Sequence, residues 1–398
     1  MTFRRLLLIP AAVLTFATLT FAHGVRVFRL SSEPLIRIGL STNSSAVTIT
    51  TGDSSLVAQS PDEASKMLAT TRVTVSARAY KPPEIEQYRI EFQNLPAQTD
   101  ANELAKDVRE STGETAIVSL DPQSNTWKVW VGTVKATEDD ANDLKQKLAE
   151  KGFEDAVLLT EKKAIVSADA VALSQQLKTQ GSSEVRSLVK NTGSTNTTAT
   201  GAVDPNLREV IVNTPVAATN FSSLKAVAFG SVNDRVNPVK LNGKSYRGKI
   251  EVFANSHGTL TVVNVVPLED YLLGVVPAEL GLPQLEAEKA QAVAARTYAV
   301  ANIGAYGKQG FDMVPTVWSQ VYKGVSIETA MGTRAVNETR GIVATYQGKP
   351  IMAYFTSTCG GRTEDGGNIF DKGAPYLKGV ECSIEGHRQF DPFIVKTL

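Results

Sequence analysis

The stretch that decides the fold begins at residue 267 and reads PLEDYLLGVVPAELG as far as residue 281. Proline is tolerated in the first turn of a helix, and acidic residues there complement the helix dipole, so PLEDYL predicts the start of a short helix. The following GVVPAELG predicts a turn that presents Glu279 among apolar neighbours. Such neighbours raise the pKa of a carboxyl group, which suits a general acid. The alternative is an ordinary solvated loop carboxylate.

Residues 285–302, LEAEKAQAVAARTYAVAN, predict a buried helix. Alanine favours helix, and small side chains let other elements approach closely. Arg296 interrupts the apolar middle, so its guanidinium must either extend to solvent or meet carboxylate or ligand oxygens. Gln291 and Tyr298 fall on one face of this helix.

These two stretches closely resemble the SpoIID/LytB family, and shorter pieces farther along the chain agree with it in order. They are SQVYKG at 319–324, AVNETRG at 335–341, YFTSTCGGRTE at 354–364 and PYLKGV at 375–380. The resemblance implies an α+β fold: a mainly-β catalytic domain over residues 206–398 with the alanine-rich helix buried in it. The strands expected over residues 33–80 resemble the family's N-terminal part.

The resemblance also implies an activity, that of a peptidoglycan lytic transglycosylase acting on glycan strands without stem peptides. By match of motif, Glu279 is the catalytic acid/base. It protonates the glycosidic oxygen and then takes the proton of the sugar's own C6 hydroxyl, which closes a 1,6-anhydro ring. No water has to be activated by a second carboxylate, and the intramolecular attack has a high effective molarity. No cofactor is required.

Further substrate contacts are predicted around Glu279. Arg296, Gln291 and Gln320 would hold acetamido or hydroxyl oxygens, Tyr298 shares the face of Gln291, and Tyr322 would stack on a sugar ring. Thr356, Ser357 and Thr358 would donate hydrogen bonds from a turn. The alternatives are structural: Tyr322 in the core, the hydroxyl residues as turn formers, and Arg296 in a buried ion pair with, for instance, Glu364.

One segment departs from the family's pattern. Relatives commonly show an acidic residue and a threonine before the SQVY element, whereas this chain has VPTVW at 314–318. Part of the cleft rim therefore differs, and Trp318 would supply a stacking surface there instead. By contrast, Asn337–Gly341 is interpreted as structural, a helix end closed by Gly341.

Residues 86–162 follow a different rhythm, with strand, helix, two strands, helix and strand in succession. The first helix is expected over residues 100–110 with Asp100 as its N-cap, and the second ends at Gly152. The segment resembles the SPOR (sporulation-related repeat) domain, a binder of bare glycan strands, in YRIEF at 88–92, WKVWVG at 127–132 and LKQKL at 144–148. Trp127 and Trp130 lie on opposite faces of their strand. Either indole could stack on sugar, or both could simply be packed.

The remaining chain sets the compartment and excludes some functions. With 41 basic and 41 acidic residues the net charge is zero, which disfavours a nucleic-acid binder. Residues 1–22 form either a cleaved export signal or a membrane anchor through residues 6–22. The protein is therefore expected in the cell envelope or periplasm, with membrane contact only through an uncleaved N-terminal segment. Residues 180–205 are polar and predict a flexible linker.

Two cysteines leave three states open. Cys359 and Cys382 would form a disulfide in an oxidising compartment, ligate zinc together with His387, or remain free thiols. The chain has no His-Glu-x-x-His array and no Gly-x-Ser-x-Gly elbow, which disfavours a zinc peptidase and a serine hydrolase. The main rival reading is a protein without catalysis of its own that binds peptidoglycan or enhances a cell-wall amidase, as some members of the family are described to do.

Overall fold

The computed structural model of the chain describes residues 24–61, 63–180, 203–216, 219–280, 284–356, 361–370 and 373–381. Residues 1–22, most of the predicted linker at 180–205, and five candidate site residues, Ser357, Thr358, Cys359, Cys382 and His387, lie outside the described residues. Within the described ranges, no helix is both long and apolar enough to cross a membrane.

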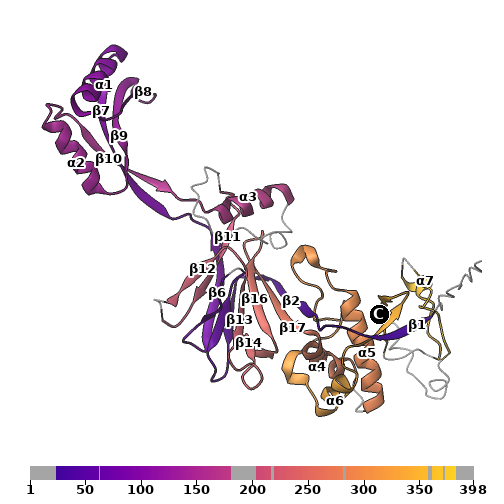
Figure 1. Ribbon diagram of the computed structural model, residues 1–398. Coiled ribbons are helices and arrows are strands. Elements are labelled where there is room, and N and C mark those ends of the chain that lie inside the picture. The colour runs from indigo at the N-terminus through magenta and orange to yellow at the C-terminus, as the bar shows by residue number, and fades with distance from the viewer. Residues whose placement is uncertain are drawn as a thin grey trace, which may run out of the picture.

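Two six-stranded antiparallel sheets form the centre of the molecule (Figure 1). The first has the order β12-β11-β6-β3-β14-β15, with bounds Phe221–Ser223, Arg208–Asn213, Arg72–Ala79, Ala46–Thr50, Val239–Leu241 and Lys244–Tyr246. The second has the order β2-β17-β16-β13-β4-β5, with bounds Leu35–Ser44, Leu260–Pro267, Lys249–Ala254, Val227–Ser231, Leu56–Gln59 and Lys66–Met67. A tight turn over residues 255–258 joins β16 to β17 in an antiparallel hairpin.

The two sheets share one hydrophobic core. Side chains alternate along each strand, so Ile36 and Ile38 of β2 and Ile250 and Val252 of β16 point inward and are fully buried. Each such side chain contributes roughly 1.5–3 kcal/mol by leaving water. The same core continues into the helices that follow β17 and fixes their position against the sandwich.

A helical region lies at one end of the sandwich (Figure 1). It consists of α4 (Leu268–Glu279), α5 (Leu285–Ala301), α6 (Ala330–Glu338) and the 3-10 helices η2 (Gly307–Gln309) and η3 (Gly324–Ile327). Next to α5, a small sheet joins β1 (Val25–Arg29) to β18 (Ile342–Tyr346) and β19 (Lys349–Pro350), and α7 spans Gly366–Ile369. The sequence did not indicate β1.

Helix α4 corrects the prediction of a turn around Glu279. The helix continues through Gly274 and Pro277 and ends at Glu279 itself. Proline costs an intrahelical hydrogen bond, but α4 is buried from Leu268 to Val276 except at Asp270, and its packing offsets that loss. Gly274 allows the segment with Tyr322 and Gly324 to pack closely against α4. A Cβ at this position would lie 2.7 Å from the Tyr322 ring and 3.0 Å from the carbonyl oxygen of Gly324.

A smaller module stands apart from the sandwich, at the far end of two long strands (Figure 1). Its elements are β7 (Glu84–Leu95), α1 (Gln98–Thr112), β8 (Ala116–Asp121), β9 (Thr126–Lys135), α2 (Glu138–Ala149) and β10 (Val157–Ala164), and its sheet has the order β10-β7-β9-β8. The order of elements is the one expected from sequence. The predicted cap is wrong, however: α1 starts before Asp100, and its N-cap is Ala97, which offers no side-chain hydrogen bond.

The module is inserted between β6 and β11, which are paired neighbours in the first sheet. After β10 the chain forms α3 (Ala168–Gln180), which the sequence did not indicate. Ala170 and Leu173 of this helix pack with Leu207 in a small separate cluster. The chain thus enters and leaves the module at one place on the sandwich.

Candidate functional site

Glu279, the last residue of α4, is half-buried and held by the backbone. The N–H of Val321 donates a hydrogen bond to Glu279 Oε1 at 2.6 Å. Burial raises the pKa of this carboxyl above its ordinary value, and the Val321 hydrogen bond opposes that rise only in part. The C-terminal end of a helix also disfavours negative charge. Glu279 therefore keeps its proton to higher pH than a free glutamate while part of it remains in reach of solvent.

Arg296 corrects the prediction of a substrate contact. Its side chain is completely buried, and its Nε and Nη2 atoms donate to the two carboxylate oxygens of Glu269 at 2.9 and 2.7 Å. Nη1 donates to the carbonyl oxygens of Ala292 and Ile342. With these contacts Arg296 cannot reach a bound glycan. The structural alternative, a buried ion pair, is the correct one, but its partner is Glu269, since Glu364 is exposed and bonds to Asn368.

Tyr322 and Gln320 are also interior residues. The Tyr322 hydroxyl donates to Asn264 Oδ1 at 2.8 Å, and its ring centroid lies 5.0 Å from that of Tyr271, so the predicted sugar stacking is wrong and the core alternative holds. Gln320 has no exposed surface, and its Oε1 accepts from the Tyr271 hydroxyl at 3.0 Å. These two side chains support the site from beneath and do not line it.

Three of the predicted contacts stay near the surface. Gln291 is half-buried as a whole, but its Nε2 atom is itself buried and has no hydrogen-bond partner among the described residues. Tyr298 is half-buried and meets the ring of Tyr354 edge-on, with 6.0 Å between centroids. Thr356 is exposed. Tyr354 in turn stacks on Phe370 at 4.3 Å, and both rings are partly exposed, so an aromatic surface extends outward from Tyr298.

Glu288 is a buried acid that the sequence reasoning missed. Only 4% of it is exposed, Oε2 has no hydrogen-bond partner in the described part of the chain, and burial raises its pKa. It lies near α4, because a Cβ on Gly332 would stand 2.9 Å from Pro277 Cγ and 3.4 Å from Glu288 Oε2. Its helical spacing from the buried alanines Ala292, Ala295 and Ala299 was the available signal.

Trp318 lies on a short, well-fixed loop that leads into the Glu279 contact. Its side chain is 83% exposed. The turn is closed by the Ser319 N–H donating to the Thr316 carbonyl at 2.9 Å, and the Val314 N–H donates to Ser319 Oγ at 3.2 Å. A chain segment of three residues spans at most about 11 Å, so the backbone of Trp318 lies within that distance of Val321. Val321 in turn bonds to Glu279, which places Trp318 near that carboxyl group.

In the small module the two tryptophans occupy opposite faces. Trp127 packs against the core beneath the helices. Trp130 lies on the helix-free face, where the Arg89 guanidinium stands 4.7 Å and the Lys128 ammonium 5.6 Å from its ring. The indole of Trp130 is only half-buried, and its Nε1 has no partner in the described residues. Of the two, Trp130 is the one placed to meet a ligand.

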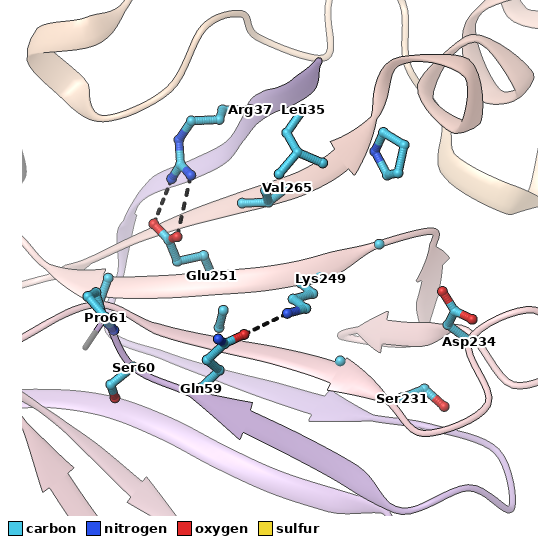
Figure 2. A pocket seen from close by; sticks show the side chains of 15 residues that line it. Leu35, Arg37, Gln59, Ser60, Pro61, Ser231, Asp234, Lys249, Glu251 and Val265 are labelled. Carbon is cyan, nitrogen blue, oxygen red and sulfur yellow. Dashed lines mark hydrogen bonds and ion pairs between the residues drawn. The ribbon is translucent and has the colours of Figure 1, made fainter. Parts of the chain in front are cut away.

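A separate hollow of about 630 Å³ lies on the outer face of the second sheet (Figure 2). The Arg37 guanidinium donates to Glu251 across strands β2 and β16, and Lys249 donates to Gln59 at 2.7 Å. Glu279 does not line this hollow. The lining reaches Pro267, the residue before α4, and includes no residue of the helix itself. Arg37, Glu251 and Lys249 are therefore already engaged in bonds to neighbouring side chains. The described residues contain no group of three or more side chains suited to a metal ion.

Comparison with known proteins identifies the part of the chain around Glu279. Residues 256–346 match the family model described as SpoIID, Stage II sporulation protein. An uncharacterised protein of Brachyspira hyodysenteriae is 43% identical over 142 residues, which cover 35% of this chain and 38% of that protein. Stage II sporulation protein D of Bacillus subtilis is 38% identical over 135 residues, 30% of this chain and 39% of that protein.

A third relative carries a different name. The amidase enhancer of Bacillus subtilis is 38% identical over 143 residues, 35% of this chain but 19% of that protein. The chain thus spans well under half the length of the curated relatives it matches. Among solved structures, the peptidoglycan binding domain of the Bacillus subtilis cell wall lytic enzyme CwlC matches 21% of this chain at 24% identity, with a TM-score of 0.18, too low to support a statement about the fold.

The matched residues hold α4 with Glu279, α5 with Arg296, and the loop from Trp318 to Val321. The portion of the chain that builds the Glu279 site is therefore the portion that is similar to the SpoIID family.

Proposed function

We propose that the protein is a peptidoglycan lytic transglycosylase that cleaves peptide-free glycan strands and leaves 1,6-anhydromuramyl ends. The observation that carries the proposal is the state of Glu279: half-buried, with a raised pKa and with Oε1 held by the Val321 N–H. No hydrogen bond to its Oε2 is present among the described residues, so this oxygen is the one offered to substrate. The carboxyl therefore presents a proton at a fixed place.

The chemistry needs one carboxyl group. The proton of Glu279 passes to the glycosidic oxygen as the bond from that oxygen to the muramyl C1 breaks. The C6 hydroxyl of the same sugar attacks C1, and its proton returns to the Glu279 carboxylate. The enzyme ends the cycle protonated as it began, and no water is consumed. Glu288 is not assigned this role, because a carboxyl that is only 4% exposed cannot meet a polymer.

Further side chains of the helical region are proposed as substrate contacts. Gln291, Tyr298 and Thr356 keep this role, and Ser357 and Thr358 follow directly in the chain. Trp318 adds a flat apolar face beside the catalytic loop, suited to the CH-rich face of a sugar ring. The hydrophobic rings of Tyr354 and Phe370 extend the same kind of surface beyond Tyr298.

The small module over residues 86–162 is proposed as a SPOR-like glycan binder. Trp130, flanked by two cations on the helix-free face of the sheet, would contact the strand there. Such a module raises the local concentration of glycan near the catalytic end. The protein would then act outside the cytoplasm in the cell envelope, exported or anchored through residues 1–22, and downstream of an amidase that removes stem peptides.

The second candidate is a non-catalytic peptidoglycan binder or amidase enhancer. The relative named amidase enhancer favours it, since it is 38% identical to this chain over 143 residues. Both candidates place the protein at the cell wall, and they differ in whether Glu279 does chemistry.

The deciding experiment incubates purified protein with glycan strands whose stem peptides have been removed. Mass spectrometry should show fragments with anhydro ends, and Glu279→Gln should abolish them while binding to the strands is retained. Glu288→Gln is the matched control and should keep cleavage. Reducing ends without the anhydro ring, or no fragments at all, would refute the transglycosylase. In a parallel assay on peptidoglycan that still carries its stem peptides, faster release of those peptides by an added amidase, unchanged in Glu279→Gln, would establish the enhancer.

A further inference from the structure

The loop that supports Glu279 is bonded at four successive residues. The Tyr271 hydroxyl donates to Gln320 Oε1 at 3.0 Å, and the Val321 N–H donates to Glu279 Oε1 at 2.6 Å. The Tyr322 hydroxyl donates to Asn264 Oδ1 at 2.8 Å, and the Lys323 N–H donates to the Gly274 carbonyl at 3.3 Å. Three of these bonds run to α4 and one to β17. The loop therefore has little freedom to move against the helix that ends in Glu279.

The bond between Tyr271 and Gln320 is unusual for its place. Both side chains are fully buried, and Gln320 Nε2 has no partner among the described residues. Burying an amide with half of its bonding capacity unused costs stability, and apolar residues would fill the same space more cheaply. What this pair provides and apolar side chains cannot is a directional hydrogen bond between α4 and the loop. The pair joins α4 to Gln320. The peptide bond between Gln320 and Val321 carries the N–H group that donates to Glu279.

We propose that the Tyr271–Gln320 hydrogen bond is a positioning device that orients the Gln320–Val321 peptide toward Glu279. The peptide N–H then holds Oε1 and leaves Oε2 to face the glycosidic oxygen. Tyr271 and Gln320 are positioning residues, because neither has surface from which to touch substrate. The inference rests on the proposed function for its kinetic consequences, whereas its structural consequences stand without it.

Other ionisable groups face α4 and must be separated from Glu279 in a pH experiment. Arg296 forms an ion pair with Glu269, and the raised pKa values of Tyr322 and Tyr298 keep both hydroxyls neutral around neutral pH. Glu288 is the competing acid, because burial raises its pKa as well. The variant Glu288→Gln removes it from the titration, and the measurements below are made in that background and in the wild type.

The first measurement uses the full chain without a substitution at the positioning pair. NMR follows the side-chain carboxyl carbon of Glu279 and the backbone amide of Val321 as pH changes. The two signals should titrate with one midpoint, because the amide proton rests on the titrating oxygen. A Val321 amide that ignores the ionisation of Glu279 would overturn the proposal, whether or not any variant folds.

The second measurement breaks the pair from each side. Tyr271→Phe and Gln320→Met should both speed hydrogen exchange at the Val321 amide and raise the Glu279 pKa further, because a bond that stabilises the carboxylate is weakened. We expect kcat to fall about 10-fold with KM within about twofold, since small misplacements of a catalytic group are costly. The alkaline limb of the kcat profile should move to higher pH. The double variant should be no worse than the single ones, because both remove the same bond.

Tyr246→Phe is the matched control. Tyr246 belongs to the same aromatic cluster, with its ring centroid 6.1 Å from that of Tyr322, and it is buried like Tyr271. Its substitution should leave Val321 exchange and the Glu279 pKa unchanged. If Tyr271→Phe lowers only the melting temperature and leaves these readings at the wild-type values, the pair is merely structural. If the Val321 exchange rate and the Glu279 pKa shift as expected but neither the wild type nor any variant cleaves glycan, the positioning role is supported and the proposed transglycosylase activity is refuted.

Discussion

At Glu279, burial and a backbone hydrogen bond act on one carboxyl group in opposite directions. Burial has the larger effect, so the pKa lies above the ordinary value of about 4.3. A general acid must start protonated, so we expect kcat to be constant at low pH and to fall as pH rises through the raised pKa. A pH–rate profile on peptide-free glycan measures this. A limb at the pKa of a free glutamate would contradict it.

The same carboxyl should cost the fold stability at neutral pH. A folded-state pKa above the unfolded value means that the folded protein binds the extra proton, so stability falls as pH rises from the unfolded to the folded pKa. Glu279→Gln removes the charge while its amide oxygen can still accept from Val321. At neutral pH we expect the melting temperature of the variant to be about 2 °C higher than that of the wild type. At acid pH, where the wild-type carboxyl is protonated in both states, the two melting temperatures should be equal. Calorimetry at both pH values checks this.

Arg296 gives a prediction about stability alone. Removing the guanidinium by Arg296→Met strands the Glu269 carboxylate in the interior, which should cost about 3–5 kcal/mol of unfolding free energy. The double variant with Glu269→Gln should recover part of that loss. Urea unfolding measures both. A stable Arg296→Met protein with a weakened affinity for glycan would restore the substrate-binding role that the structure rejects.

Trp318 gives the opposite pattern, a loss of affinity without a loss of stability. An indole that is 83% exposed contributes little to the fold. Trp318→Ala should weaken binding of peptide-free glycan to the Glu279→Gln variant about 10-fold, which corresponds to about 1.4 kcal/mol. Val317→Ala, beside it and 80% exposed, is the control. Calorimetric titration with equal affinities for both variants would remove Trp318 from the site.

Among the elements, α4 shows best what sequence reasoning reached and where it stopped. The start of the helix followed from its first-turn residues, the helix over residues 285–302 from its alanine content, and the order of elements in the small module from the succession of strand and helix patterns. The continuation of α4 through Gly274 and Pro277 did not, because both residues are helix breakers locally and the compensation comes from the helices and strands packed around them.

The site shows the same division. An arginine in an apolar helix predicts a carboxylate or ligand partner. That the partner is Glu269 depends on the packing of α4 against α5, which no local pattern encodes. Tyr322 and Gln320 stand in a polar-looking loop, and only the tertiary structure turns both side chains inward. Glu288 shares the spacing of the buried alanines, a signal that was present in the sequence.

Gly274 links the helix to the catalytic loop and can be tested at the scale of the element. In an ordinary helix, Gly→Ala stabilises by up to about 1 kcal/mol. Here a Cβ would stand 2.7 Å from the Tyr322 ring, so Gly274→Ala should destabilise by about 1–3 kcal/mol and displace the loop. Denaturant unfolding gives the sign directly. A stabilised variant would show that the loop and helix are not in close contact.

At the scale of the whole molecule, the small module and the sandwich are separable. Ile85 and Lys163 are direct partners across β7 and β10, and β6 and β11 are paired beneath them. Replacing residues 86–162 by an Asn-Gly hairpin should therefore leave the melting temperature of the remaining protein within about 4 °C. The shortened protein should still cleave soluble glycan and bind sedimented cell wall less. Loss of folding would show that the module is part of the catalytic unit.

The position of β1 gives the molecule a direction. Its five residues follow directly on the described N-terminus and pair with β18 beside α5, so the beginning of the chain is fastened to the helical end that carries Glu279. The module with Trp130 lies at the other extremity (Figure 1). Any tether at the amino terminus would thus keep Glu279 close to the surface to which the chain is attached. The small module, proposed above as the glycan binder, would project away from that surface.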